Sequence, residues 1–416
     1  MALETRVLDN GLTVHIDRKD EGTASLFVIV NAGFARAGQV TDTPHVLEHM
    51  QAKTYMELPE LSYARKNAHT SDEKTVYEIE RILEEDAQLA AENLAKVLIT
   101  LNREVFAREK KTVGQEVTEY ANPQYLLNVE AKRLLFPRQS VIVPTFDKRS
   151  PGGADVPKSD CYPHSVGNMT EGMCRGFFET YYGTTNVEVL LSGSLPSNDT
   201  ALERIIAPFN AIMNSGKKNE NFTWPDEETF RERQEVSGRV SPKPGVALAL
   251  FWQLDGIMKD WPTEDAVALI VLRNYLNMMG GPLFKELRHD RQLVYSCGAT
   301  IDGFGENNAF VVHAASPDEG SVPALEDGIR IALTNVIDKG ISPSIIDGQR
   351  KMSIVTNRRE MRKSNYGDFL GRQKYPRFYA ERDNAFATVN SDQVVKQAAN
   401  LLEKPYLVQK SYQLKS

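Results

Sequence analysis

A polar and highly charged segment, residues 214–245, separates two stretches of similar length in this chain. It reads NSGKKNENFTWPDEETFRERQEVSGRVSPKPG, and its Pro and Gly residues are typical of a connector between domains. At roughly 150 residues per domain, 416 residues suffice for two or three hydrophobic cores. We therefore predict an N-terminal domain at 1–213, a linker at 214–245 and a C-terminal domain at 246–416.

Strand and helix patterns alternate within both stretches, without long blocks of one type. Alternating or β-branched runs predict strands at 12–17, 25–32, 75–80, 186–193, 246–254, 293–301 and 308–314. Helical patterns are expected at 43–52, 86–102, 104–120, 169–182, 263–279 and 282–290, with further helices to the end of the chain. This arrangement predicts an α+β fold made of two α/β halves.

The composition argues against two classes of protein. Asp and Glu outnumber Lys and Arg by 56 to 49, so the net charge of −7 disfavours a general nucleic-acid binder. No apolar run approaches the roughly 18 residues of a membrane helix. The first residues lack the layout of a signal peptide, and the three cysteines include no CxxC pair. We therefore expect a cytoplasmic protein that binds neither nucleic acid nor membrane.

The most informative motif is the pentad His45-Val46-Leu47-Glu48-His49. Positions i and i+4 of a helix face the same way, so both imidazoles can reach one ion. Glu48 lies on the same side, where it can take a proton from a water that the metal activates. Zinc suits imidazole ligands, and two His plus one carboxylate leave a fourth position open. This HxxEH order is the inverted zincin motif; the alternative is two surface histidines on a helix.

A third metal ligand is expected in the helical stretch 104–120. Its candidates are the four acidic residues Glu104, Glu109, Glu116 and Glu119. Glu109 and Glu116 are two helical turns apart, so one carboxylate can reach the metal while the other supports a histidine. The spacing equally allows a solvated helix face with i,i+4 pairs.

These motifs together resemble the M16 family of zinc peptidases, the group of pitrilysin, insulysin and mitochondrial processing peptidase, and in particular its shorter two-domain members. The resemblance covers nearly the whole chain. It is carried by LDNGLTVHI at 8–16, TPHVLEHM at 43–50, NAHTSDEKTVYEIE at 67–80, EKKTVGQE at 109–116, FFETYYGTTNVEVLLSG at 177–193 and GGPLFKELRHDRQLVYS at 280–296.

The resemblance implies a fold and a set of roles. The fold would be two related α/β sandwich halves of the LuxS/metallopeptidase-like kind, each an antiparallel-rich sheet flanked by helices. His45, His49 and Glu116 would hold one zinc ion per chain, with Glu109 as support and Glu48 as general base. Asn67 would bind the backbone of a peptide substrate. In the second half, Arg288 would hold substrate and Tyr295 would donate to the oxyanion; the alternatives are a charged helix end and a core tyrosine.

The implied activity is zinc-dependent cleavage of short or unfolded peptides by a homodimer, with Arg288 and Tyr295 completing the site of the partner. One alternative is a subunit of a heterodimeric processing peptidase with a related companion chain and one dedicated precursor. The other is a non-catalytic structural member of the family.

One spacing departs from the family pattern. Glu116 follows His49 by 67 positions, roughly nine fewer than is usual for this motif. The missing residues fall between His49 and Asn67, so we expect an altered rim beside the site. The Pro- and Gly-rich segment 137–168 is a candidate partner-binding or gating loop.

Overall fold

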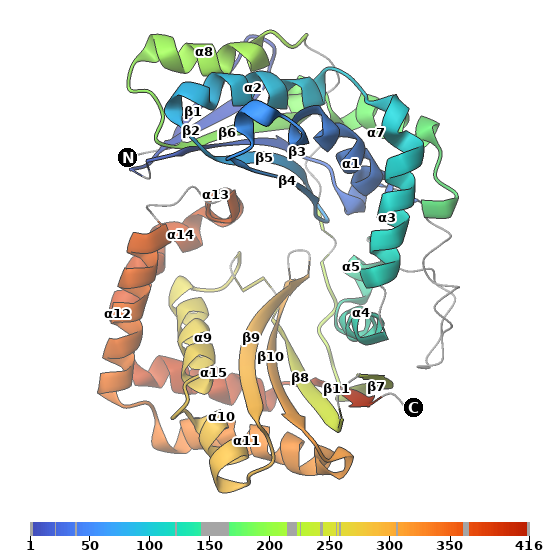
Figure 1. The fold of residues 1–416 in the computed structure, drawn as a ribbon. Helices are drawn as coiled ribbons and strands as arrows, with labels where there is room; N and C mark the ends of the chain where they lie inside the picture. Colours follow the sequence, from blue (N-terminus) through green and yellow to red (C-terminus); the bar gives the residue numbers. More distant parts are fainter. Residues whose placement is uncertain are drawn as a thin grey trace.

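Two β-sheets with their helices build the fold in a computed structural model (Figure 1). It describes residues 3–413 apart from 21, 38–39, 121–122, 143–165, 214–222, 225, 242–243, 255, 258, 305–306 and 361–365. Most of the predicted loop 137–168 therefore lies outside the described residues. Among those described, no helix is long and apolar enough to cross a membrane. The predicted α+β class is confirmed.

The first sheet has the strand order β1-β2-β6-β3-β5-β4. Its strands are β1 (Glu4–Val7), β2 (Thr13–Arg18), β3 (Ala24–Val30), β4 (Arg65–Thr70), β5 (Thr75–Ile82) and β6 (Val187–Gly193). Strands β2 and β6 pair in parallel, and all other neighbours are antiparallel. The accompanying helices are α1 (Thr43–Met56), α2 (Ala87–Ala95), α3 (Phe106–Tyr120), α7 (Glu171–Tyr181) and α8 (Asp199–Asn210).

The second sheet has the order β7-β11-β8-β10-β9. Its strands are β7 (Gln234–Ser241), β8 (Val246–Leu254), β9 (Ser296–Phe304), β10 (Asn307–Ser316) and β11 (Leu407–Gln413). The helices that follow are α9 (Thr263–Leu276), α10 (Pro282–Phe284), a π-helix (Lys285–Asp290), α11 (Val322–Lys339), α12 (Pro343–Glu360), α13 (Tyr366–Lys374), α14 (Pro376–Thr388) and α15 (Ser391–Glu403).

The two sheets repeat one topology. Strands β7 and β11 pair in parallel, as β2 and β6 do, and antiparallel β8, β10 and β9 follow as β3, β5 and β4 follow in the first sheet. The prediction of two related halves is confirmed in this respect. Strand β7 lies within the predicted linker 214–245; the domain bounds themselves stay a prediction.

Two sequence expectations are wrong in detail. The chain does not end in helices, because β11 follows α15 and pairs between β7 and β8. The helix expected at 86–102 ends at Ala95 and continues as a single 3₁₀ turn over Lys96–Leu98. Strand β4 is absent from the predicted set: it is an edge strand without a fully buried residue, so it carries no alternating apolar pattern.

The main core of each half lies between its sheet and its helices. Strand β3 shows how the sequence fits both of its faces, because every one of its residues is buried. Leu26, Val28 and Val30 face the helices, whereas Phe27 and Ile29 alternate with them and face the opposite side. A continuous apolar run is what a strand covered on both faces requires.

The inner faces of the sheets are covered by helices exchanged between the halves. Helix α13, from the second half, places Phe369 against Phe27, Ile29 and other apolar residues of the first sheet. Helix α4 (Pro123–Leu135), which follows α3 in the first half, packs with Leu135 against the second sheet. Figure 1 shows α13 beside the first sheet and α4 beside the second. The two halves are therefore interlocked by reciprocal packing.

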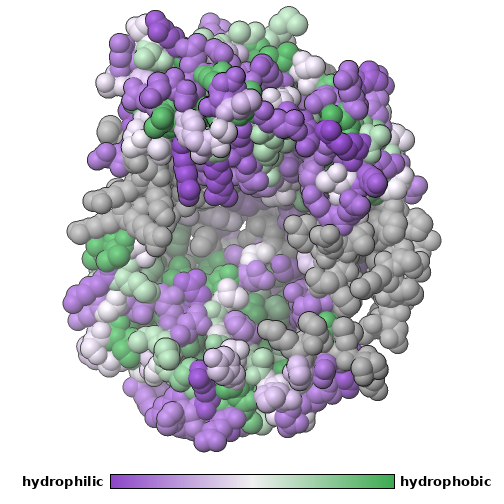
Figure 2. Space-filling model, in the orientation of Figure 1, coloured by the Kyte–Doolittle hydropathy of each residue, from purple (hydrophilic) through white to green (hydrophobic). Residues whose placement is uncertain are grey.

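Polar contacts reinforce the docking of α13. Gln373 donates from Nε2 to Oε2 of Glu188 on β6, at 3.3 Å, and His15 Nε2 lies 3.0 Å from the same oxygen. Lys374 forms a 2.6 Å ion pair with Glu73 in the β4–β5 turn. Between the halves the molecule is hollowed, as the space-filling view shows (Figure 2).

Candidate metal centre

Helix α1 positions the predicted pentad. Pro44 lies in the first turn, where its missing N–H costs no helical hydrogen bond. Val46, Leu47 and Met50 are fully buried in the core of the first half and fix the rotation of the helix. The predicted helix is confirmed and extends to Met56. Its remaining face presents His45 and His49 toward α3 and Glu48 toward β4.

Helix α3 supplies the third candidate ligand. Val113 and Val117 are buried, which turns Glu109 and Glu116 toward α1. The Oε2 atom of Glu116 lies 3.6 Å from Nε2 of His45 and 3.4 Å from Nε2 of His49. Among the candidate carboxylates whose side chains the structure describes, Glu104, Glu109 and Glu116, Glu116 is the one that meets both imidazoles.

The donor set fits a zinc ion. One ligand atom from each of His45, His49 and Glu116 lies within 4.8 Å of the others, and these three are the sole such group found in the described ranges. Tetrahedral ligands at about 2 Å from zinc lie roughly 3.4 Å apart, close to the two distances from Glu116. Two imidazole nitrogens and one carboxylate oxygen also match the ligand types that zinc prefers.

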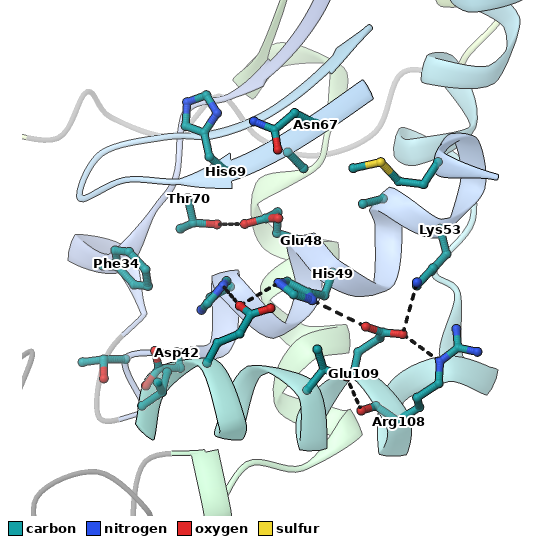
Figure 3. Close-up of a pocket in the computed structure, with 18 of the residues that line it drawn as sticks. Phe34, Asp42, Glu48, His49, Lys53, Asn67, His69, Thr70, Arg108 and Glu109 are labelled. Atoms are coloured by element: carbon teal, nitrogen blue, oxygen red, sulfur yellow. Dashed lines mark hydrogen bonds and ion pairs between the residues drawn. The ribbon is translucent and has the colours of Figure 1, made fainter. Parts of the chain in front are cut away.

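Glu109 lies behind His49 and is buried (Figure 3). Its Oε2 is 3.5 Å from Nδ1 of His49, so the ring can donate there and keep the lone pair of Nε2 free for a metal. Arg108 and Lys53 neutralise the other oxygen, at 2.8 and 3.8 Å. Sequence reasoning missed these two cations. Their signal was spacing: Lys53 is four residues after His49, and Arg108 precedes Glu109.

Burial sets the protonation of the site in the absence of an ion. Burial, with a smaller contribution from the neighbouring His49, lowers the pKa of His45 to about 4, so the imidazole is in the neutral form that binds metals. The pKa of Glu48 is raised to about 8 by burial and, to a smaller extent, by the charge of Glu116, against the opposing hydrogen bond from Thr70. A dication beside Glu48 would favour its carboxylate form.

A cavity of about 980 Å³ surrounds these residues, between α1, α3 and β4. Asn67 and His69 of β4 line it, and the ring of Phe34 meets that of His45 edge-on. The side chain of Asn67 donates to Glu78 at 2.9 Å, and the backbone carbonyl of Asn67 accepts from the hydroxyl of Tyr55. The segment after the pentad is short, as the sequence predicts: Met56 ends α1, and only a 3₁₀ turn at Pro59–Leu61 precedes β4.

Arg288 and Tyr295 lie together in the second half and do not line this cavity. The guanidinium of Arg288 stacks between the rings of Phe284 and Tyr295, at 4.8 and 4.9 Å from their centroids. Tyr295 is 82% exposed, so the alternative of a core tyrosine is wrong. Arg288 has no ion-pair partner among the described residues.

Comparisons with known proteins define the fold. Residues 168–353 match the model of the peptidase M16 inactive domain. A protease from Helicobacter pylori is 18% identical over the full length of both chains, with a TM-score of 0.77. A peptidase M16 inactive domain from Pseudomonas fluorescens is 17% identical, with a TM-score of 0.74 over 100% of this chain and 99% of that one.

The first half of the periplasmic protease PqqL from Escherichia coli is also similar. It is 14% identical with a TM-score of 0.73, over 99% of this chain and 92% of that one. No curated protein sequence matches the chain. The chain therefore has the fold of M16-like peptidases, and residues 168–353, from α7 of the first half into α12 of the second, match their inactive domain.

Proposed function

We propose that this protein is a zinc-dependent peptidase, in which the first half carries the metal and the second half completes the substrate site. The single observation that carries the proposal is the convergence of His45, His49 and Glu116 beside a buried glutamate, Glu48. A peptide is the substrate class that the M16-like fold supports.

Each residue has a definite task in this proposal. When bound, zinc supplies a Lewis acid that polarises the scissile carbonyl and acidifies water. Glu48 accepts a proton from the attacking water and delivers it to the leaving amine. Glu109 holds the ring of His49 in its metal-binding tautomer. Asn67 lines the cavity on β4, where it can bind the backbone of an extended peptide.

Arg288 and Tyr295 would act on the substrate from outside the cavity of their own chain. Because they do not line it, a homodimer in which they complete the site of the partner is the arrangement that we propose. A mixture of Glu48→Gln and Tyr295→Phe subunits should then recover cleavage that neither variant shows alone, provided that the subunits exchange. Mixtures that stay inactive would contradict sharing between subunits. The cytoplasm stays the predicted location.

A second candidate is a partner-type or non-catalytic member, which the match to an inactive domain favours. The partner-type form would be one subunit of a heterodimeric processing peptidase, active with a companion chain on one dedicated precursor. The matched residues 168–353 do not include the pentad or Glu116, so the match supports a non-catalytic second half directly. It supports a non-catalytic chain only if the first half fails to bind metal.

Zinc content and peptide cleavage, measured together, test these candidates. Wild type and Glu48→Gln would be supplied with zinc and incubated with a mixture of unstructured peptides, and products would be identified by mass spectrometry. Cleavage by wild type alone supports the peptidase. Bound zinc without cleavage by either protein supports the subunit with a companion chain. A protein that binds no zinc and cleaves no peptide supports the non-catalytic member and overturns the main proposal.

A further inference from the structure

Thr70 is the residue that holds the carboxylate of Glu48. Its hydroxyl donates a 3.0 Å hydrogen bond to Oε2 of Glu48, whose side chain is 5% exposed (Figure 3). Within the described part of the chain, no other side-chain donor bonds to this carboxylate. Resting on the proposed function, we propose that Thr70 is a positioning residue that orients Glu48 and leaves its Oε1 free to accept the proton.

The orientation of a glutamate needs such a partner. The last torsion of a Glu side chain is broad, so a carboxylate without a fixed donor rotates about it. A hydrogen bond to one oxygen sets the plane of the group and therefore the direction of the other oxygen. Threonine serves this purpose better than serine, because its β-branch restricts the first side-chain torsion and fixes the hydroxyl.

The backbone at Thr70 is held on both sides, by strand pairing before it and by the β4–β5 turn after it. Strand β4 pairs with β5, and the turn that joins them begins directly after Thr70. Within this turn, Ser71 donates its N–H to the carbonyl of Lys74 at 2.8 Å. The turn also accepts backbone N–H groups from Phe34 and Ala35, at the carbonyls of Ser71 and Asp72.

Gly33 allows this close approach. A Cβ atom at Gly33 would lie 2.0 Å from the carbonyl oxygen of Ser71 and 2.7 Å from the backbone nitrogen of Lys74. Backbone atoms cannot yield to such an overlap, so only glycine fits. The turn is thereby held against residues 33–35, and the pairing of β4 with β5 holds the backbone of Thr70 on the other side.

Three variants test the proposal. Thr70→Val keeps the shape of the side chain and removes the hydroxyl; Thr70→Ser keeps the hydroxyl. Thr54→Val is the matched control, because Thr54 lies on the same helix as Glu48 but donates its hydroxyl to the helix carbonyl of Gln51. Zinc content and thermal unfolding would be measured for all three.

A lost hydrogen bond to a charged group corresponds to roughly a 10- to 100-fold fall in rate. We expect that fall in kcat for Thr70→Val, with KM within about twofold of wild type, unchanged zinc content, and most of the activity retained in Thr70→Ser. Thr54→Val should match wild type. An active wild type with a fully active Thr70→Val would overturn the positioning role while leaving the proposed function intact.

A second readout is independent of activity. Crystal structures of wild type and Thr70→Val would show the orientation of the Glu48 carboxylate directly. We expect one orientation in wild type and a rotated or divided carboxylate in the variant. An unchanged carboxylate in Thr70→Val would overturn the proposal even if the protein cleaves no peptide.

Discussion

Phe369 on α13 tests whether the exchanged helices bind the two halves together. Its ring is 4% exposed and packs against Phe27, Ile29, Val76 and Leu190, each of which is at most 1% exposed. The ring centroid also lies 4.9 Å from that of His15. Truncation of a buried Phe to Ala costs about 3–5 kcal/mol, through lost burial and the cavity left behind. Because α13 is short and can move into part of that cavity, we expect about 3 kcal/mol for Phe369→Ala.

Urea unfolding, followed by circular dichroism, measures this loss as a shift of the midpoint at unchanged slope. Val355→Ala is the control, since Val355 is 66% exposed on α12 and its truncation should change the free energy of unfolding by less than about 0.5 kcal/mol. A loss below about 1 kcal/mol for Phe369→Ala would refute the reasoning, because the inner face of the first sheet would then not depend on α13.

Three further predictions concern the metal and pH. Glu109→Gln should weaken zinc binding roughly 10- to 100-fold, measured by competition with a chelator, because the support of the imidazole is weakened. Chelation should lower the melting temperature and zinc should restore it; at zinc 100 times its Kd, the ion adds about 2.7 kcal/mol, and a melting temperature insensitive to zinc would contradict the site. Burial would raise the pKa of Glu188, but hydrogen bonds from His15 and Asn31 and the charge of Lys74 lower it from 4.5 to about 2. Stability from this carboxylate is complete above pH 4.5 and is lost as the pH falls toward 2, so Glu188→Gln should flatten the pH dependence of the unfolding free energy in that range.

The pairing of the two histidines in the candidate metal site was predictable from the sequence because its information is local. The i, i+4 spacing of His45 and His49 places both rings on one helix face wherever that helix packs. The choice of Glu116 over the other carboxylates needed either the family resemblance or the structure, since spacing alone leaves the rotation of α3 open. Thr70 was harder to find, because its partner Glu48 is distant in sequence and β4 lacks the apolar alternation of a strand.

The exchange of α4 and α13 could not be predicted from the sequence. Each helix carries an apolar stripe that would suit either sheet, and nothing local distinguishes the nearer half from the other. The sequence of strand β3 did indicate that a further segment covers the sheet. Its uninterrupted apolar run requires cover on both faces, while the helices of its own half cover only one. The sequence therefore implied that some segment packs on the inner face, without saying which.

The repeated topology explains how one chain can match an inactive domain and still present a candidate metal site. Helix α9 follows β8 and precedes β9, as α1 follows β3 and precedes β4. The sequence of α9, TEDAVALIVLRNYL, has no histidine, and eight of its residues are buried. It therefore cannot offer the paired imidazoles that α1 offers. The matched residues 168–353 contain α9 and exclude α1, so the proposed difference between the halves would rest on the residues that these equivalent helices expose.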